Sequence, residues 1–204
     1  MTLDLAAFEA ALAAASSDWR RRRYCVALSG GLDSTVLVHL AAGALADRLR
    51  AVHVDHGLHP DSGEWRDSAA ACCAALGVPF TSLTVDVGAA AGESLEAAAR
   101  AARYDALAAV LEPGEILLTA HHADDQAETV LLQLLRGAGP AGLAAMPAST
   151  AFAGGRLCRP LLGFDRAALA DHARRHGLAW REDPSNADVR ADRNYLRHRV
   201  LPRL

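Results

Sequence analysis

The chain has 204 residues, of which 51% are hydrophobic and 22% charged, and its formal net charge is -3. This length and composition predict one globular domain and exclude a disordered or collagen-like chain. Because the charge is slightly negative, any contact with nucleic acid has to come from local clusters of arginine. We expect no membrane segment, since the longest apolar run, residues 36–46, is too short to cross a bilayer.

The cysteines and the N-terminus indicate the compartment. Cys25, Cys72, Cys73 and Cys158 show no CxxC spacing, so we interpret them as reduced, buried thiols. The N-terminus lacks the positive segment that begins a secretory signal. We therefore expect a cytoplasmic protein.

The chain begins with an alanine-rich stretch, residues 2–17, in which Leu5, Phe8 and Leu12 fall on one helical stripe. This pattern predicts an N-terminal helix within residues 1–19. Four arginines, residues 20–23, follow. We interpret them as a solvated edge before a buried strand, with contact to phosphate groups as the alternative.

A strand, a glycine turn and a helix are predicted over residues 24–40, and the turn reads SGGLDS. Two glycines let the backbone approach a ligand, and the N-terminus of the following helix favours an anion. The GxxxxGK[ST] loop is excluded because the chain has no lysine, and the glycine spacing does not fit GxGxxG. Asp33 is unusual beside a phosphate site, and its charge needs a metal ion or a cationic group to offset it.

A second strand, residues 49–54, completes a βαβ unit, which predicts a parallel sheet. His53 and Val54 end this strand at the same edge as the glycine turn, where open α/β sheets bind ligands. His53, His56 and His59 lie on an irregular loop. Their spacing argues against a metal site and favours a loop that lines a nucleotide-base pocket.

The remaining pattern predicts alternating helices and strands, with helices over residues 62–76, 93–111 and 165–176, strands over 79–87 and 116–119, and a hairpin over 151–160 around Gly154-Gly155. The predicted fold class is α/β, an open parallel sheet with helices on both faces, Rossmann-like, with a small C-terminal helical appendage.

Arg100 and Arg103 lie one turn apart on one of these helices. Surface ion pairs with Glu96 and Asp105 are the alternative to a functional role for these two arginines.

The stretch TAHHADDQAET, residues 119–129, is predicted at the carboxyl end of another strand. His121, Asp125 and Glu128 would share one face of a helix and form an acid/base patch. Two alternatives are a metal site and simple capping of the helix N-terminus by the acids.

The tail carries a basic patch on a predicted helix, formed by Arg193, Arg197, His198 and Arg199. A solvated face balanced by Asp188 and Asp192 is the alternative. Residues 183–186 predict a turn. The chain ends within what we interpret as a continuing segment, so we expect further C-terminal domains in the full protein.

Several motifs now agree: SGGLDS, HVDHGL, ESLEAAARAARY, TAHHADDQAETVLLQLLRGAGPAGLAAM, RPLL and EDPSN…RNYLRHRVLP. Over residues 20–204 they resemble the catalytic domain of the tRNA(Ile)-lysidine synthetase family, within the PP-loop (N-type ATP pyrophosphatase) superfamily. The resemblance implies an adenine-nucleotide alpha hydrolase-like fold. It also implies that ATP adenylates the wobble cytidine of tRNA(Ile) with a CAU anticodon. Free L-lysine then attacks C2 of the base, and the products are lysidine, AMP and pyrophosphate.

The resemblance also implies roles for individual residues. The residues implied in ATP binding are Ser29, Gly30, Gly31, Leu32, Asp33, Ser34, His53 and Val54, and Asp33 would also hold Mg²⁺. Asp125, Glu128 and Arg103 would bind the lysine, and Arg193 and Arg197 would hold the phosphate or the tRNA. The implied catalytic residues are Asp33, Arg100, His121, Asp125, Glu128 and Arg193.

Three alternatives to the ligase remain. The first is another PP-loop enzyme of tRNA modification, although a thiolation enzyme needs cysteines placed for sulfur transfer or for a cluster. The second is a nucleotide-binding module without turnover. The third is a basic RNA-binding module. The sequence leaves open whether the protein forms a homodimer.

Overall fold

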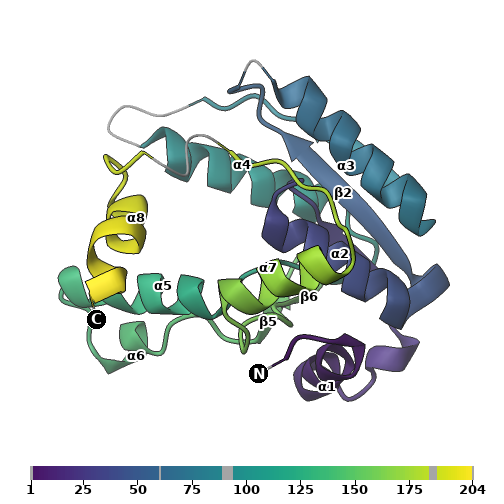
Figure 1. The fold of residues 1–204 in the computed structure, drawn as a ribbon, viewed down its shortest axis with the longest axis horizontal. Coiled ribbons are helices and arrows are strands. Elements are labelled where there is room, and N and C mark those ends of the chain that lie inside the picture. The colour runs from purple at the N-terminus through teal and green to yellow at the C-terminus, as the bar shows by residue number, and fades with distance from the viewer. Residues whose placement is uncertain (1, 60, 89–93, 184–187, 204) are drawn as a thin grey trace.

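The structure is a computed structural model that describes residues 2–59, 61–88, 94–183 and 188–203. In these residues, strands form one six-stranded sheet in the order β3-β2-β1-β4-β6-β5 (Figure 1). The strands are β1 (Tyr24–Ala27), β2 (Leu49–Asp55), β3 (Phe80–Thr84), β4 (Ile116–Leu118), β5 (Ser149–Phe152) and β6 (Gly155–Cys158). The α/β prediction is confirmed, with one difference: β5 runs antiparallel to β6 at the edge of an otherwise parallel sheet.

The helices alternate with the strands, and their bounds are α1 (Leu5–Ala15), α2 (Leu32–Leu45), α3 (Ser62–Leu76), α4 (Leu95–Val110), α5 (Ala123–Leu135), α6 (Pro140–Leu143), α7 (Arg166–Arg175) and α8 (Asp192–Tyr195). A π-helical turn, Leu196–Val200, continues α8. Figure 1 shows α5, α6 and α8 gathered on one side of the molecule, with the C-terminus beside α5. The C-terminal helical appendage that the sequence predicts corresponds to α8 and the π-helical turn, which lie beside α5.

Local signals account for most helix bounds. The Asp4 carboxylate caps α1 by accepting from the Ala7 N–H at 2.8 Å, and the Ser94 hydroxyl caps α4 by accepting from the Ala97 N–H at 3.2 Å. Gly177 follows α7 with a φ of 59°, as expected for a C-terminal glycine. The predicted helix start at Glu93 and the predicted turn at residues 184–186 lie outside the described residues.

Both faces of the central strand are buried. Tyr24 and Val26 of β1 belong to a large core with α1, α2, α3 and α7, whereas Cys25 belongs to a second cluster beneath α4. Alternate residues of a strand point to opposite faces, so a fully apolar strand is what two buried faces require. The helices on both faces were predicted, and the structure confirms them.

The strand order places β1 at the point where the chain changes direction across the sheet. The chain moves from β1 to β2 and β3 on one side, and then returns to β4 on the other side of β1. The carboxyl ends of β1 and β4 are therefore neighbours at the topological switch point. Open α/β sheets bind their ligands there.

Among the described residues, no helix combines the length and the apolar composition that a membrane crossing requires.

Candidate active site

The glycine turn between β1 and α2 is closed by the hydroxyl of Ser34. This oxygen accepts from the N–H groups of Ser29 and Gly30 at 3.2 and 3.1 Å, and the hydroxyl donates to the Gly31 carbonyl at 3.1 Å. Gly30 has a φ of 86°, a conformation that side chains with a Cβ rarely adopt. Its carbonyl accepts from the Arg181 N–H at 3.1 Å, so the segment after α7 crosses the turn.

Two predicted ATP-binding residues of this turn differ in what their side chains face. Leu32 begins α2 and is buried in the large core, so only its backbone can reach a ligand. Asp33 lies in the first turn of α2 and is partly exposed. Its Oδ1 atom is buried and has no hydrogen-bond partner among the described residues. Such an oxygen fits Mg²⁺, which binds one or two carboxylates together with water and phosphate oxygens.

His53 and Val54, at the end of β2, point toward protein. His53 is 5% exposed, and its Nδ1 lies 2.9 Å from the Leu28 carbonyl, to which it donates. Burial lowers the pKa of His53, so the ring is neutral. Val54 packs partly against the cluster beneath α4. Contact of either residue with an adenine base would therefore use the backbone.

His122, which the sequence reasoning did not single out, lies close to three carboxylates. It precedes α5, is 1% exposed, and its Nε2 lies 3.6 Å from Asp33 Oδ2 and 3.5 Å from Asp125 Oδ2. Its Nδ1 lies 3.3 Å from Asp124 Oδ2. Burial alone would lower the pKa of His122, but these carboxylates, with Asp33 foremost, raise it overall. His122 thus links the glycine turn to α5.

Two carboxylates of α5 and two arginines of the tail form a paired group. Arg193 Nε lies 2.5 Å from Glu128 Oε2, and Arg197 Nε lies 2.6 Å from Glu128 Oε1. Arg193 Nη2 also lies 2.9 Å from Asp125 Oδ1. Glu128 is fully buried, and both of its oxygens are engaged. The idea that these arginines are a solvated face balanced by Asp188 and Asp192 is therefore wrong, and Asp188 pairs with Arg190 instead.

His121 lies beside this group. Its Nδ1 is 2.9 Å from the Thr119 hydroxyl, which leaves the Nε2 side of the ring for a ligand. Burial, helped by the positive charges of Arg159, Arg100 and Arg193 and opposed by Asp125, lowers the pKa of His121 to about 4. The ring is consequently neutral near pH 7.

Arg100 and Arg103 of α4 do not form the ion pairs that were the alternative. Among the described residues, no ion pair joins either one to Glu96 or Asp105. The Arg100 guanidinium lies 5.0 Å from the centre of the Tyr104 ring. Arg103 Nε donates to His56 Nε2 at 3.2 Å. Both arginines therefore remain available for an anionic ligand.

The fold and the site can now be compared with known proteins. A family model described as a PP-loop domain matches residues 5–204. The chain belongs to the PP-loop family. Membership of this family implies ATP use, and we call the glycine turn of residues 29–34 the PP-loop from here on.

Two curated relatives of this chain share the name tRNA(Ile)-lysidine synthase. A tRNA(Ile)-lysidine synthase of Alkalilimnicola ehrlichii is 58% identical over 182 residues, which is 88% of this chain and 41% of that protein. A tRNA(Ile)-lysidine synthase of Pseudomonas aeruginosa is 53% identical over 201 residues, covering 96% of this chain and 45% of that protein. The chain spans less than half the length of these relatives.

Solved structures support the fold alone. A U34-tRNA thiolase of Methanococcus maripaludis aligns with a TM-score of 0.75 at 16% identity, covering 94% of this chain and 70% of that one. An NMN synthetase of Francisella tularensis aligns with a TM-score of 0.56 at 12% identity, covering 87% of this chain and 72% of that one.

In the described residues, this chain has no group of three or more His, Cys, Asp and Glu side chains that could hold a metal ion.

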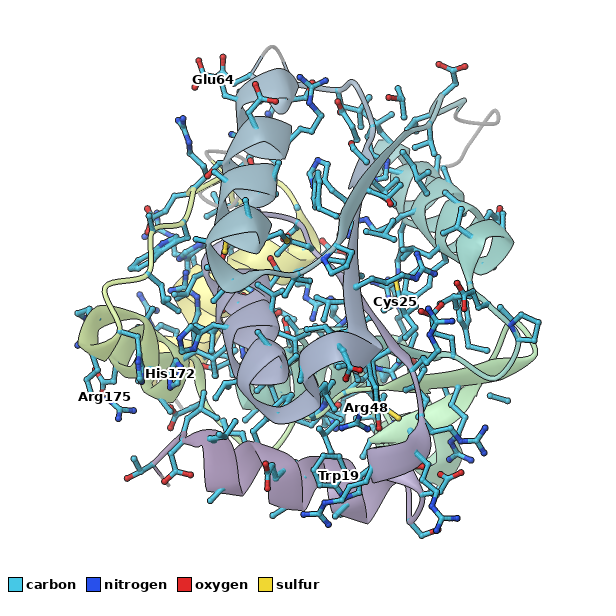
Figure 2. All side chains as sticks on the ribbon, turned by 90° about the vertical axis from the view of Figure 1, so that its right-hand side faces the viewer. Trp19, Cys25, Arg48, Glu64, His172 and Arg175 are labelled. Carbon is cyan, nitrogen blue, oxygen red and sulfur yellow. The ribbon has the colours of Figure 1, made fainter. Side chains whose placement is uncertain are left out.

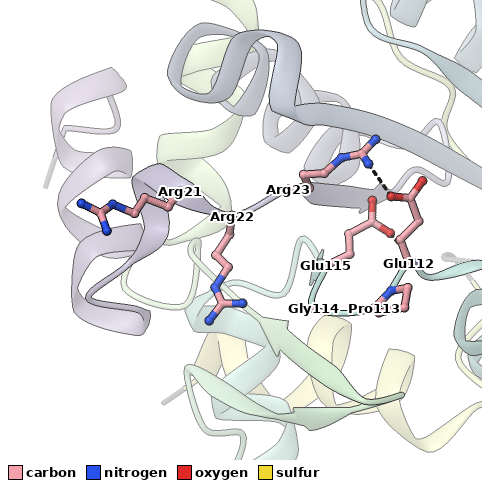
Figure 3. A pocket seen from close by; sticks show the side chains of 7 residues that line it. All are labelled: Arg21, Arg22, Arg23, Glu112, Pro113, Gly114 and Glu115. Atoms are coloured by element: carbon pink, nitrogen blue, oxygen red, sulfur yellow. Dashed lines mark hydrogen bonds and ion pairs between the residues drawn. The ribbon is translucent and has the colours of Figure 1, made fainter.

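A hollow of about 210 Å³ lies at the other end of the sheet from the PP-loop (Figure 3). It is lined by Arg21, Arg22, Arg23, Glu112, Pro113, Gly114 and Glu115. These residues precede β1 and β4, so the hollow lies at the amino ends of the strands. Arg23 pairs with Glu112 across it at 2.5 Å. The hollow is therefore distinct from the candidate site at the PP-loop edge.

The sequence contains a signal that would have found His122. It occupies the N-cap position of α5, and its backbone N–H donates to the Asp125 side chain at 3.0 Å. A histidine at the start of a helix and three residues before an acid is placed to meet that acid. Its contact with Asp33 depends on the pairing of β1 and β4, which residue spacing alone does not reveal.

Proposed function

We propose that this chain is the catalytic region of an enzyme that joins free L-lysine to C2 of the wobble cytidine of tRNA(Ile) with a CAU anticodon. The reaction consumes ATP, passes through an adenylated cytidine, and yields lysidine, AMP and pyrophosphate. The proposal is supported by the named relatives and by one observation. This observation is the contact through His122 between Asp33 of the PP-loop and Asp125 of α5.

The contact through His122 matters because the reaction needs two activities at one place. The PP-loop has to present the α-phosphate of ATP to the cytidine, and a second group has to deliver the lysine amine to C2 of the same base. Parallel strands bring their carboxyl ends to one edge, which is where a shared substrate would meet both groups. Binding and orientation of this kind can supply several kcal/mol of the rate enhancement, about 7–11 kcal/mol in favourable cases.

Ser29, Gly30, Gly31 and Ser34 would hold the β and γ phosphates through backbone N–H and hydroxyl groups. Asp33 would hold Mg²⁺ through its buried, unpartnered Oδ1. When bound, Mg²⁺ would neutralise negative charge on the phosphates. The remaining contribution of this turn is orientation, since its conformation is already set by the Ser34 hydrogen bonds.

The amine site has to bind an ammonium ion and then remove a proton from it. The side-chain amine of lysine has a pKa near 10.4, so roughly one molecule in 2,500 is neutral at pH 7. Both predicted carboxylates pair with Arg193 and Arg197, but Asp125 is the better placed of the two, because its side chain is 13% exposed whereas Glu128 is fully buried. In this proposal Glu128 anchors Arg193 and Arg197, and Asp125 meets the amine. Arg103 would bind the lysine carboxylate.

His121 is our candidate general base. A base has to be unprotonated before it acts, and the lowered pKa of His121 keeps the ring neutral near pH 7. Thr119 uses Nδ1, so Nε2 would take the proton. Arg100 would stabilise negative charge on the departing phosphate or on the cytidine O2.

The test is the ATP-dependent incorporation of radiolabelled lysine into unmodified tRNA(Ile) with a CAU anticodon. Initiator methionine tRNA, which shares this anticodon, is the control for selectivity. We expect label in the isoleucine tRNA alone. If ATP binds but neither tRNA nor a high concentration of the anticodon stem-loop is labelled, the proposal is wrong for this chain.

AMP release and tRNA binding, measured under the conditions of this assay, separate the alternatives. A nucleotide-binding module would bind ATP without releasing AMP in the presence of tRNA and lysine. A basic RNA-binding module would bind tRNA equally well after Asp33→Ala, and the unaltered chain would not release AMP either. A thiolation enzyme would need a sulfur donor, and lysine would have no effect on its AMP release.

A further inference from the structure

Three arginines lie near the PP-loop edge without a carboxylate partner, and we call Arg100, Arg103 and Arg159 the arginine cluster. Arg100 and Arg103 belong to α4. Arg159 directly follows β6, which pairs with β4. The Thr119 N–H donates to the Cys158 carbonyl at 3.1 Å. Arg159 therefore lies next to the segment that leads into His121.

None of these three arginines has an acidic partner in the described part of the chain, and Arg159 in addition holds a buried donor without an acceptor. Among the described residues, no Asp or Glu oxygen lies within 4.0 Å of these three guanidinium groups, whereas Arg22, Arg23, Arg50, Arg181, Arg193 and Arg197 each have such a partner. Arg159 Nη1 donates to the Pro147 carbonyl at 2.8 Å. Arg159 Nε is buried and has no hydrogen-bond partner there. A buried guanidinium N–H without an acceptor is costly, and a bound anion would remove that cost.

The cluster members influence one another and the site. Burial lowers the pKa of Arg159, and the charge of Arg100 lowers it further, against an opposing effect from Tyr104. Arg159 and Arg100 also lower the pKa of His121. Like charges held together repel unless an anion neutralises them. Arg159, whose Nε has no acceptor among the described residues and which follows the strand paired with β4, therefore favours negative charge beside the proposed general base.

We propose that the arginine cluster, through Arg159 and Arg100, binds a phosphodiester group of the RNA substrate next to the base that reacts, while Arg103 is left for the lysine carboxylate. This assignment rests on the proposed function and extends it to a phosphate-binding site outside the PP-loop. Arginine forms charge-assisted, often bidentate hydrogen bonds with phosphate oxygens. Such contacts position a nucleic acid without reading its sequence. The triphosphate of ATP also carries phosphate groups that arginines could bind, but in the proposed function the PP-loop holds it.

The experiment measures RNA binding in the absence of lysine and ATP. Binding of a fluorescent anticodon stem-loop of tRNA(Ile) to the chain is followed at several salt concentrations, and ATP binding is measured separately. The variant is Arg159→Gln. The matched control is Arg156→Gln, which makes the same charge change three residues earlier on β6, at an exposed position where Arg156 Nε donates to the Ser149 hydroxyl.

We expect Arg159→Gln to weaken RNA binding about tenfold and to lower the slope of log K against log salt by about 1, as for the loss of one phosphate contact. ATP affinity should stay within about twofold, the size of a remote electrostatic effect. Arg156→Gln should change neither. Arg159→Lys, which keeps the charge, should retain most of the RNA affinity.

Three outcomes would overturn the assignment. They are equal RNA binding by Arg159→Gln and Arg156→Gln, a loss of ATP affinity in place of RNA affinity, and no RNA binding by the unaltered chain at low salt. If circular dichroism shows that Arg159→Gln does not fold, Arg100→Gln decides, because no hydrogen bond to the protein is lost there among the described residues. Lysine incorporation is a separate assay, so its failure with RNA binding intact would count against the proposed function alone.

Discussion

The two edges of the sheet use arginine in different ways. At the amino edge, Arg23 pairs with Glu112, and Arg50 makes two short contacts of 2.8 and 2.6 Å with the buried Glu115. Arg48 donates to the carbonyls of Trp19 and Arg20. Figure 2 shows Trp19 and Arg48 at the opposite end of the molecule from Glu64, which pairs with Arg181 near the PP-loop. At the PP-loop edge, Arg193 and Arg197 pair with Asp125 and Glu128, but the arginine cluster has no acidic partner among the described residues.

This difference shows what a partner does to a charged side chain. A guanidinium that is bound by a carboxylate contributes to the fold, and its charge is neutralised before any ligand arrives. A guanidinium held only by an aromatic ring, a histidine or a carbonyl keeps its charge for a ligand. The hollow at the amino edge is rich in arginine, but its Arg23 pairs with Glu112 across it, and its Arg22 and Glu115 pair with Asp18 and Arg50.

The largest expected effect comes from the PP-loop carboxylate. Asp33→Asn removes the charge that would hold Mg²⁺, and we expect lysine incorporation to fall about 1,000-fold, which is in the range for loss of several kcal/mol of metal assistance. The free energy of unfolding should change by less than about 1 kcal/mol, as is usual for partly exposed polar groups. Urea denaturation and single-turnover labelling measure the two quantities. Asp47→Asn, in the exposed turn after α2, is the control. Turnover that survives Asp33→Asn would show that this carboxylate holds no essential metal.

Glu128→Gln tests the paired group at the same edge. Both arginines lose their shared partner, and Arg193 and Arg197 are each 28% exposed, so the cost is partly relieved by water. We expect the unfolding free energy to fall by about 1–3 kcal/mol and turnover about 100-fold, since breaking a buried pair leaves a charge uncompensated. Glu64→Gln breaks an exposed pair with Arg181 and should cost less than about 1 kcal/mol. Equal stability losses in the two variants would contradict the assignment of Glu128 as an anchor.

Glu115→Gln makes the same chemical change at the amino edge. The Glu115 side chain is 1% exposed and accepts from Arg50 and from the Glu112 N–H. We expect a loss of about 2 kcal/mol of unfolding free energy, because Arg50 is left partly buried without its partner. At a temperature where the variant stays folded, KM for ATP and for lysine should be unchanged. A change in either KM would mean that the two edges are not independent.

Much of the PP-loop edge could be predicted from the sequence because its signals are local. The glycine pair, the strand before it and the apolar helix after it lie within residues 24–40, and neighbouring residues determine their conformation. The parallel sheet follows from the alternation of strands and helices. The caps at Asp4 and Ser94 and the glycine after α7 are likewise local, and the structure agrees with them.

The pairing between distant side chains could not be predicted in this way. Glu128 and Arg197 are 69 positions apart, and Arg50 and Glu115 are 65 apart. Residue spacing gave no reason to choose these partners over Asp188 or Asp192. The antiparallel β5 was recognised as half of a hairpin, but its place at the sheet edge depends on the pairing of β6 with β4. These features depend on tertiary contacts, which a single sequence does not specify locally.

Three histidines between α2 and α7 extend the comparison of charged side chains, because histidine can lose its proton near neutral pH and arginine cannot. His39 Nδ1 lies 3.1 Å from His172 Nε2, and His172 Nδ1 lies 3.3 Å from the Leu3 carbonyl, so His172 donates through Nδ1 and accepts through Nε2. Burial lowers the pKa of both histidines from 6.5, and the nearby His176 lowers it further. The folded state therefore holds them neutral.

The pH dependence follows from the sign of these shifts. Below the unfolded pKa of 6.5 the unfolded chain binds more protons than the folded one, so stability is present above that pH and is lost as the pH falls below it. The urea midpoint should drop between about pH 7.5 and pH 5.5, and the drop should be smaller in His172→Gln. Arg174→Gln is the matched control, because Arg174 lies on the same helix, pairs with the exposed Asp171 and does not titrate in this range. Its drop should stay close to that of the unaltered chain. An identical drop in His172→Gln would show that His121 or His53, which burial also keeps neutral, accounts for the acid sensitivity.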